Sequence, residues 1–222
     1  MSTYCNNCRA KASCTRYKKC SNCKTVSYCT ERCQADHWPV HQPLCKPYDP
    51  NVVWGIRILS NNGVTKLKKL PMNFFQHEMI SDPDHPIYRE GEQCPVTERC
   101  GIPLIIYKVP NSTGPNEISV KLRIEASNGY APPAWQVWDL GECIVVREDR
   151  KPLTKELLEA LFSFNGPYLM TYPFDEAAQE EVWGPWQHLL NPTVWQIFAL
   201  KHYDEQYQAG RPGFGCFLPG GI

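Results

Sequence analysis

The 222-residue sequence contains no apolar run that approaches the roughly 20 residues needed to cross a bilayer. Its first residues are polar and lack the apolar stretch of a secretory signal. The glycine fingerprint of dinucleotide-binding folds, the Walker loop and the Gly-x-Ser-x-Gly elbow of hydrolases are also missing. We therefore expect an intracellular protein, of the nucleus or the cytoplasm, with no membrane span and none of these common enzyme motifs.

The net charge of the chain is also zero, but the positive and negative residues are distributed unevenly along the sequence. Residues 1–46 contain eight Lys or Arg and two acidic residues, whereas the rest of the chain contains 15 Lys or Arg and 21 acidic residues. A basic N-terminal segment thus precedes an acidic remainder. Such a segment attracts acidic partners, although the same charges also serve simply to keep a small module in solution.

Cysteine, by contrast, is abundant, with 12 residues in the chain. Eight of them lie between Cys5 and Cys45. Thiols stay reduced in the nucleus and the cytoplasm, so dense cysteines in such a protein indicate a metal site in preference to disulfides. Of the others, Cys94 and Cys100 lack ligand spacing, and we expect them to be ordinary buried or unpaired thiols.

The ligand-capable residues of the N-terminal segment fall into four pairs. Two residues separate the members of the first two pairs, and three residues separate the members of the last two. The shorter spacing lets a tight turn bring two thiolates onto one ion, and the longer one places two ligands on the same face of a helix. Eight ligands make two tetrahedral zinc sites, one with four cysteines and one with three cysteines and a histidine, with no open position for substrate or water. The pairs are Cys5 and Cys8, Cys20 and Cys23, Cys29 and Cys33, and His41 and Cys45.

This pattern closely resembles the MYND-type zinc finger, over about a fifth of the chain. All eight ligands are present, together with Tyr28, Gln34, Trp38 and Pro39 at the expected places. The resemblance implies a cross-brace, in which the first and third pairs share one zinc ion and the second and fourth pairs share the other. Spacing alone is equally compatible with a sequential arrangement. The implied sites are Cys5, Cys8, Cys29 and Cys33 (site 1) and Cys20, Cys23, His41 and Cys45 (site 2).

Two further ligand-capable residues lie among the pairs. Cys14 falls in the long gap between Cys8 and Cys20 and has no partner at two-residue spacing, so we interpret it as a spare thiol. His37 lies four residues before His41, but Pro39 stands between them. Because proline interrupts helices, the two histidines need not share a face, and we expect a solvated His37.

The resemblance also implies a function for the finger. Fingers of this type are similar to one another in binding short proline-containing peptides, and the resemblance extends to a role in transcriptional regulation. A short strand over residues 24–28, which includes Ser27, offers backbone groups to which an extended peptide can add. Trp38 would supply an aromatic face for proline or leucine, and Gln34 a hydrogen-bonding amide. The competing interpretation is that Trp38 packs internally and the finger is purely structural.

Other functions fit the sequence less well. The segment has no long base-reading helix and no C2H2 spacing, so sequence-specific nucleic-acid binding is disfavoured. The best enzymatic alternative is a SET-type lysine methyltransferase, because some MYND fingers belong to such enzymes. We find neither their Asn-His-Ser/Cys-like motif nor their Gly-x-Gly strand after residue 50. We therefore expect a non-enzymatic protein.

The remainder of the chain predicts a separate α+β domain. Residues 1–46 form the finger, residues 47–52 a proline-containing linker, and residues 53–222 a companion domain of unknown function. Within the companion domain, residues 145–161 resemble the companion region of fungal MYND-finger proteins. Since the finger is too small for an apolar core, we expect it to fold on its metal and the companion domain to fold independently. Predicted strands cover residues 53–59, 104–107, 120–125 and 143–146; predicted helices begin after Thr154, Asp175 and Asn191, and Gly210 ends the last of them.

Overall fold

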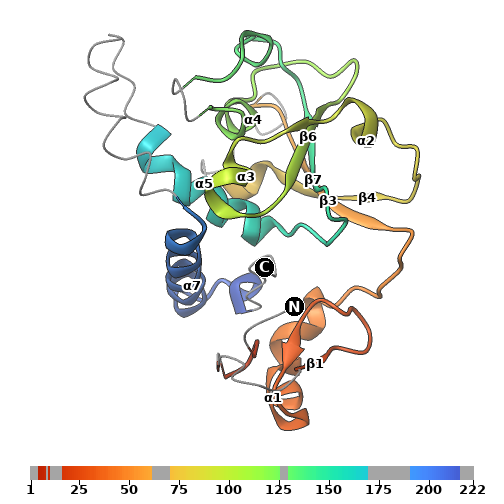
Figure 1. Cartoon of the computed structure of the whole chain (residues 1–222), viewed down its shortest axis with the longest axis vertical. Coiled ribbons are helices and arrows are strands. Elements are labelled where there is room, and N and C mark those ends of the chain that lie inside the picture. Colours follow the sequence, from red (N-terminus) through yellow and green to blue (C-terminus); the bar gives the residue numbers. More distant parts are fainter. Residues whose placement is uncertain are drawn as a thin grey trace. The chain divides into compact units, whose positions relative to one another are not determined.

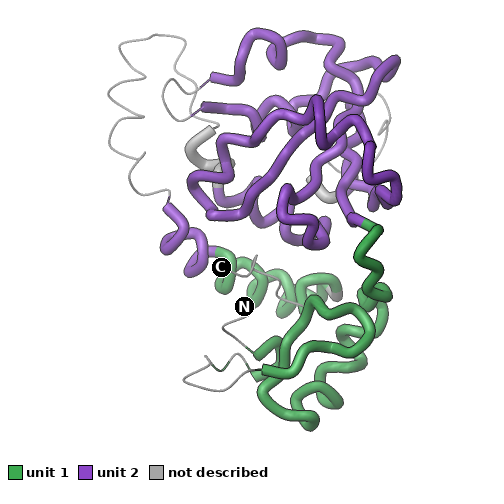
Figure 2. The backbone as a smooth tube through the Cα atoms, turned by 45° about the vertical axis from the view of Figure 1, so that its right-hand side comes forward, with its two compact units in different colours: residues 1–52, 199–222 green, residues 53–198 purple. Residues whose placement is uncertain are grey.

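The structure is a computed structural model that describes residues 5–8, 10, 17–61, 71–125, 130–169 and 191–215. The chain divides into two compact units, which Figure 2 shows in different colours. The first combines residues 1–52 with residues 199–222, and the second comprises residues 53–198. The predicted division assigned all of residues 53–222 to one domain, whereas here the last part of the chain groups with the finger. None of the helices in the described ranges combines the length and the apolar character needed to span a membrane.

An antiparallel sheet of five strands is the framework of the second unit (Figure 1). The strand order is β4-β3-β7-β6-β5, so the central strand β7 pairs on one side with β3, which comes from a distant part of the sequence. These results confirm the predicted α+β class and three of the four predicted strands. The strands are β3 (Val53–Ile58), β4 (Phe75–Ile80), β5 (Glu92–Gln93), β6 (Leu104–Lys108) and β7 (Cys143–Arg147).

Short helices and turns connect and cover these strands. Helix α5 contacts β4, α3 and α4, and its apolar stripe of Leu157, Leu158 and Leu161 is buried. A second apolar cluster centres on Ile105, Ile144 and Val146 of the sheet. The helical elements of this unit are η3 (Pro71–Phe74), α2 (Ile87–Glu90), α3 (Val96–Cys100), α4 (Glu117–Leu122), η4 (Pro133–Trp135), α5 (Lys155–Leu169) and the first residues of α7 (Pro192–Gln208).

Side-chain caps start the two long helices at the predicted places. The Thr154 hydroxyl accepts a hydrogen bond from the Leu157 amide at 3.1 Å, and the Asn191 side chain accepts from the amides of residues 193 and 194. Helix α7 ends at Gln208, and Gly210 follows in the left-handed conformation that glycine favours (φ 80°). The helix predicted after Asp175 lies outside the described residues.

The strand predicted over residues 120–125 was wrong, because this segment contributes to helix α4. Asn116 caps α4 by accepting a hydrogen bond from the Ser119 amide at 3.1 Å. Ile118 and Leu122, four residues apart, are both buried on one face of the helix. Three alternating apolar residues fit a strand, but Leu122 fits the helical period from Ile118 equally well, and the cap decides between the two.

Three buried cysteines contribute to the packing of the second unit. Cys94, Cys100 and Cys143 have at most 1% of their surface exposed and none forms a disulfide, which confirms the prediction for the first two. Burial raises the pKa of Cys100 to about 12 and that of Cys143 to about 11, so both thiols stay protonated and unreactive at neutral pH.

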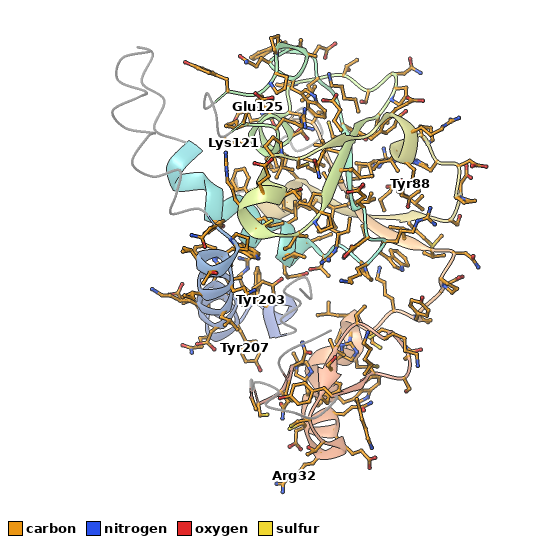
Figure 3. All side chains as sticks on the ribbon, in the orientation of Figure 1. Arg32, Tyr88, Lys121, Glu125, Tyr203 and Tyr207 are labelled. Carbon is orange, nitrogen blue, oxygen red and sulfur yellow. The ribbon has the colours of Figure 1, made fainter. Side chains whose placement is uncertain are left out.

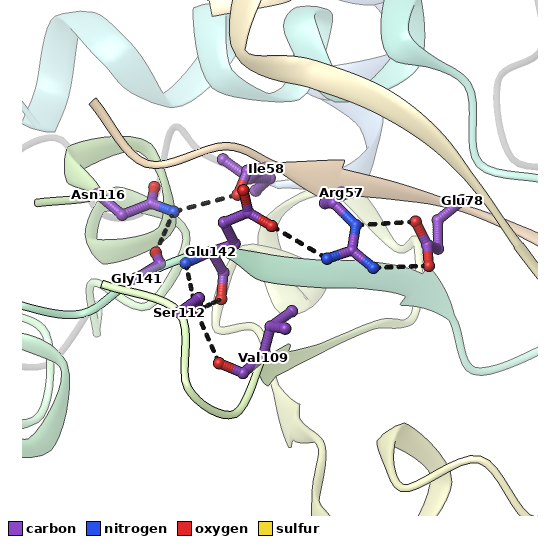
Figure 4. Close-up of polar contacts among 8 residues, drawn as sticks. All are labelled: Arg57, Ile58, Glu78, Val109, Ser112, Asn116, Gly141 and Glu142. Carbon is purple, nitrogen blue, oxygen red and sulfur yellow. Dashed lines mark hydrogen bonds and ion pairs between the residues drawn. The ribbon is translucent and has the colours of Figure 1, made fainter. Parts of the chain in front are cut away.

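A charged triad links three segments of the sheet region (Figure 4). Arg57 on β3 donates two hydrogen bonds of 2.9 Å to the carboxylate of Glu78 on β4. It also donates one of 3.0 Å to Glu142, just before β7. These hydrogen bonds, those to Glu78 first, raise the pKa of the guanidinium of Arg57 above its ordinary value. The three side chains are only 24–29% exposed, so the cation is needed to keep two carboxylates close together.

We expect Arg57→Ala to lower the free energy of unfolding of the second unit by about 2 kcal/mol, because two partly buried carboxylates lose their shared cation. The measurement is urea unfolding followed by circular dichroism. Lys151→Ala is the control, since its ion pair with Asp149 is half exposed and is worth at most about 1 kcal/mol. Equal losses for both variants would contradict a special role for the triad.

Candidate metal centre

Four short elements build the described part of the finger, and Figure 1 shows them at the red and orange end of the chain. Two residues of β1 pair with two residues of β2 in an antiparallel hairpin. Helix α1 follows, begins after the capping residue Thr30 and runs for 11 residues. The elements are β1 (Lys18–Lys19), β2 (Ser27–Tyr28), α1 (Glu31–His41) and the turn η1 (Gln42–Leu44).

The first cluster joins the first and third pairs. Cys5 and Cys8 lie in one turn, Cys29 directly follows β2, and Cys33 lies in the first turn of α1. The Thr30 cap holds this turn, because its hydroxyl accepts a hydrogen bond from the Cys33 amide at 3.1 Å. The four sulfur atoms lie within 4.8 Å of one another.

The second cluster joins the second and fourth pairs. Cys20 and Cys23 lie in a tight turn closed by a hydrogen bond from the Lys24 amide to the Cys20 carbonyl at 3.0 Å. His41 is the last residue of α1, and Cys45 follows η1. The three sulfur atoms and one ring nitrogen also lie within 4.8 Å of one another. The structure therefore has the interleaved cross-brace and not the sequential arrangement.

The distances within both clusters suit a zinc ion. A tetrahedral ion with Zn–S bonds of about 2.3 Å holds its sulfur ligands about 3.8 Å apart. The Cys8–Cys29 and Cys29–Cys33 sulfur pairs are 3.6 and 3.5 Å apart, and the Cys20–Cys45 pair is 3.8 Å apart. The Cys23 sulfur lies 3.4 Å from Nε2 of His41, which makes this nitrogen the ligand atom. The finger thus provides two four-ligand zinc sites.

Neighbouring side chains orient the ligands of site 2. The Thr25 hydroxyl donates to the Cys23 sulfur at 2.8 Å, and the side-chain amide of Asn22 donates to the Cys45 sulfur at 3.2 Å. Such contacts fix ligand geometry and stabilise thiolate charge. Sequence reasoning missed both residues, because a threonine or asparagine beside a cysteine carries no distinctive spacing.

The thiols of site 1 differ in their affinity for protons. A hydrogen bond with Thr30 is the main cause that lowers the pKa of Cys33, to about 6. Hydrogen bonds with Cys33 and Cys8 raise the pKa of Cys29 to about 12. Zinc binds thiolates, so Cys29 must release a proton when the ion enters at neutral pH. Zinc affinity therefore falls as the pH falls.

The prediction of a solvated His37 was wrong. His37 is 5% exposed, and helix α1 continues through Pro39 to His41. The two histidines consequently share a face, and their rings stack with centroids 6.1 Å apart. Proline removes a single helical hydrogen bond, and the zinc ligands at both ends of α1 keep the helix in place. Cys14 lies outside the described residues.

The three residues predicted to bind a peptide differ in accessibility. Trp38 is 38% exposed and contacts the ring of His41 edge-on, and Gln34 is half-buried one turn earlier. Ser27 is only 2% exposed, and both its backbone N–H and its carbonyl are hydrogen-bonded to Asn6 at 2.8 Å. Ser27 therefore cannot receive a peptide strand as it stands, whereas Trp38 is reachable from solvent.

We expect elemental analysis of the pure protein to give about two zinc ions per chain, because each cluster offers a complete tetrahedral ligand set. Cys20→Ser should remove at least one of them, since three strong ligands remain where four are needed. Cys14→Ser is the matched control and should retain both ions. A ratio near one for the unaltered chain would contradict the double site.

Comparison with known proteins agrees with this geometry. Residues 5–45 match the family described as "MYND finger". The chain is 41% identical over 44 residues to "SET domain-containing protein 14" of Caenorhabditis elegans, and 46% identical over 41 residues to "Zinc finger MYND domain-containing protein 10 homolog" of Drosophila melanogaster. These matches cover 20% and 18% of this chain, and 10% and 8% of the two relatives. No solved structure matches. Residues 5–45 are therefore a MYND finger, a zinc-binding module.

Proposed function

We propose that the finger binds a short proline-containing peptide of a protein partner, through the outer edge of β1 and the exposed part of helix α1. The observation that carries this proposal is the exposure of Trp38 on a helix whose two ends are fixed by zinc ligands. An aromatic ring on a rigid helix is a suitable anchor, since binding costs little conformational entropy.

The pairing of the hairpin supports β1 as the edge that receives the peptide. Lys19 lies opposite Ser27, and Ser27 directs its backbone groups away from β1, towards Asn6. In an antiparallel pair such residues both point their N–H and C=O groups outwards, so Lys19 presents its own groups on the other edge. This moves the proposed edge from residues 24–28 to β1 and retains strand addition as the mode of binding.

An ion pair brings this edge close to the proposed anchor. The Lys18 ammonium group lies 2.7 Å from the carboxylate of Glu31, in the first turn of α1. Gln34 follows one turn along the helix, and Trp38 follows one turn after Gln34. A peptide of a few residues beside β1 can thus reach first the side-chain amide of Gln34 and then the indole ring of Trp38.

Two observations favour a protein partner over nucleic acid. Lys18 pairs with Glu31, and Arg32 lies 3.8 Å from Asp36, so acidic groups of the finger already accompany two of its cations. The described helix of the finger has 11 residues and carries its zinc ligands, and it offers no row of base-reading side chains. We propose that the partner is a protein in the nucleus or cytoplasm, with transcriptional regulation as the context.

We also propose that the chain is not an enzyme. The likeness to the relative named for a SET domain is confined to the finger. Gly213 and Gly215 do form a Gly-x-Gly sequence, but they lie in the turn η6 (Pro212–Gly215) and not in a strand. This position differs from the donor-binding strand that the methyltransferase alternative requires.

We expect Trp38→Ala to weaken binding of a peptide with a proline–leucine core at least tenfold and to leave both zinc ions in place. Loss of a central interface tryptophan costs about 2 kcal/mol or more, and a decade of affinity corresponds to about 1.4 kcal/mol. Titration calorimetry would use the zinc-loaded full chain and a peptide selected by screening.

Trp138→Ala is the matched control for this experiment. Trp138 is 83% exposed, but it belongs to the second unit, so its loss removes as large a surface ring without touching the finger. Unchanged affinity for Trp38→Ala at equal zinc content would contradict the proposed surface and favour a structural finger. Equal losses in the two variants would indicate that the peptide binds elsewhere.

A further inference from the structure

The end of the described chain forms a small aromatic core within the first unit. Phe214 is 1% exposed and packs edge-on against Tyr203 of α7, with ring centroids 5.1 Å apart. The Arg211 guanidinium lies over the Phe214 ring at 4.6 Å. Figure 3 shows Tyr203 and Tyr207 projecting from α7. Residues 199–215 therefore have apolar contacts of their own.

Gly215, at the end of this segment, packs directly on helix α1. Its carbonyl accepts a hydrogen bond from Nε2 of His37 at 3.0 Å. A Cβ atom at Gly215 would lie 2.1 Å from the Val40 side chain, which is closer than Cβ atoms approach other atoms, and 3.1 Å from Tyr207, which is already a tight contact. A larger residue at position 215 would therefore have to displace Val40, and the limitation is space and not backbone conformation.

The same histidine is fixed from the side of the finger. Because the Gly215 carbonyl can only accept, Nε2 of His37 carries a proton, and Nδ1 accepts from the Tyr28 hydroxyl at 3.0 Å. Tyr28 is fully buried beside the ligand Cys29, and the His37 ring stacks on the ligand His41. His37 thus connects residues 212–215 with the surroundings of both zinc sites.

We propose that residues 212–215 are a zinc-dependent latch: docking of this segment on the His37–Val40 face of α1 and zinc binding by the finger are one coupled equilibrium. Helix α1 has 11 residues, and an isolated helix of this length is marginal in water. Cys33 and His41 hold it when zinc is bound, and only then does His37 stand where it can bond Gly215. This inference goes beyond peptide binding and does not depend on it.

The coupling must act in both directions. If zinc strengthens docking of the segment by some factor, docking strengthens zinc binding by the same factor. A finger without residues 199–215 would then bind zinc more weakly than the full chain, although it keeps all eight ligands. Removal of zinc would in turn release the end of the described chain, together with the face of α1 that it covers.

The decisive variant is Gly215→Val, which blocks docking while keeping all eight ligands. Zinc affinity of the full chain would be measured by competition with a chromogenic chelator, and hydrogen exchange would be followed over residues 213–215. We expect Gly215→Val to weaken zinc affinity at least about fivefold, the lower range of such couplings, and to speed exchange of the segment although zinc is saturating. Chelation of zinc should speed the same amides in the unaltered chain.

His37→Ala provides a second route to the same state and guards against misfolding of the first variant. Both changes remove the contact between His37 and Gly215, so the double variant should speed exchange of the segment no more than the stronger single variant. Asp36→Ala, which alters the exposed neighbour of His37, should behave as the unaltered chain. The amides of β7 should exchange equally slowly in all variants, as a check on the second unit.

Two results would overturn the latch. One is unchanged zinc affinity in both Gly215→Val and His37→Ala. The other is slow exchange of residues 213–215 that survives removal of zinc, since the segment would then dock without the metal. Neither result bears on the titration of Trp38→Ala, so the latch and the peptide surface succeed or fail separately.

Discussion

Coordination of two ions by ligands that alternate along the chain is the interaction on which the finger depends. Among the residues of the finger that the structure describes, the buried core consists largely of the ligands themselves, accompanied by Val26 and Tyr28. So small a core cannot offset the conformational entropy of ordering some 40 residues, whereas two structural zinc ions contribute about 10 kcal/mol or more each at neutral pH. The turns, the hairpin and helix α1 all follow from this constraint.

Helix α1 shows how one element serves several purposes once its ends are fixed. Successive residues are about 100° apart around a helix. Cys33, His37 and His41 consequently lie near one side, where two bind zinc and the third bonds Tyr28 and Gly215. Gln34 and Trp38 lie on the neighbouring flank of the helix, about 80° further round on average, and Trp38 is exposed. The peptide surface and the latch are thus adjacent faces of a single metal-held helix.

The residues that the sequence predicted well are those whose signals are local. The eight ligands followed from paired spacing, and the starts of α5 and α7 followed from the caps Thr154 and Asn191. The interleaving of the pairs came only from the family resemblance, because spacing allows two arrangements. The short alternation of apolar and charged residues over residues 120–125 predicted a strand, whereas Asn116 caps a helix, α4, that includes the first part of this segment.

The features that the sequence did not predict depend on contacts between distant residues. His37 is buried where it donates a hydrogen bond to the carbonyl of Gly215, 178 positions away in the sequence. No local sequence pattern indicates that these two residues are neighbours. Ser27 is enclosed by Asn6, which lies in a turn before the hairpin. The grouping of residues 199–222 with the finger has the same origin. The prolines of residues 47–52 indicated a domain boundary, but they carried no information about which segments of the chain pack together.

The cross-brace is the central claim, and heteronuclear NMR of the cadmium-substituted protein tests it most directly. Each cadmium nucleus couples through bonds to the side-chain protons of its own ligands. One nucleus should couple to Cys5, Cys8, Cys29 and Cys33, and the other to Cys20, Cys23, His41 and Cys45. Coupling of one nucleus to Cys5, Cys8, Cys20 and Cys23 would show a sequential arrangement and would contradict the account.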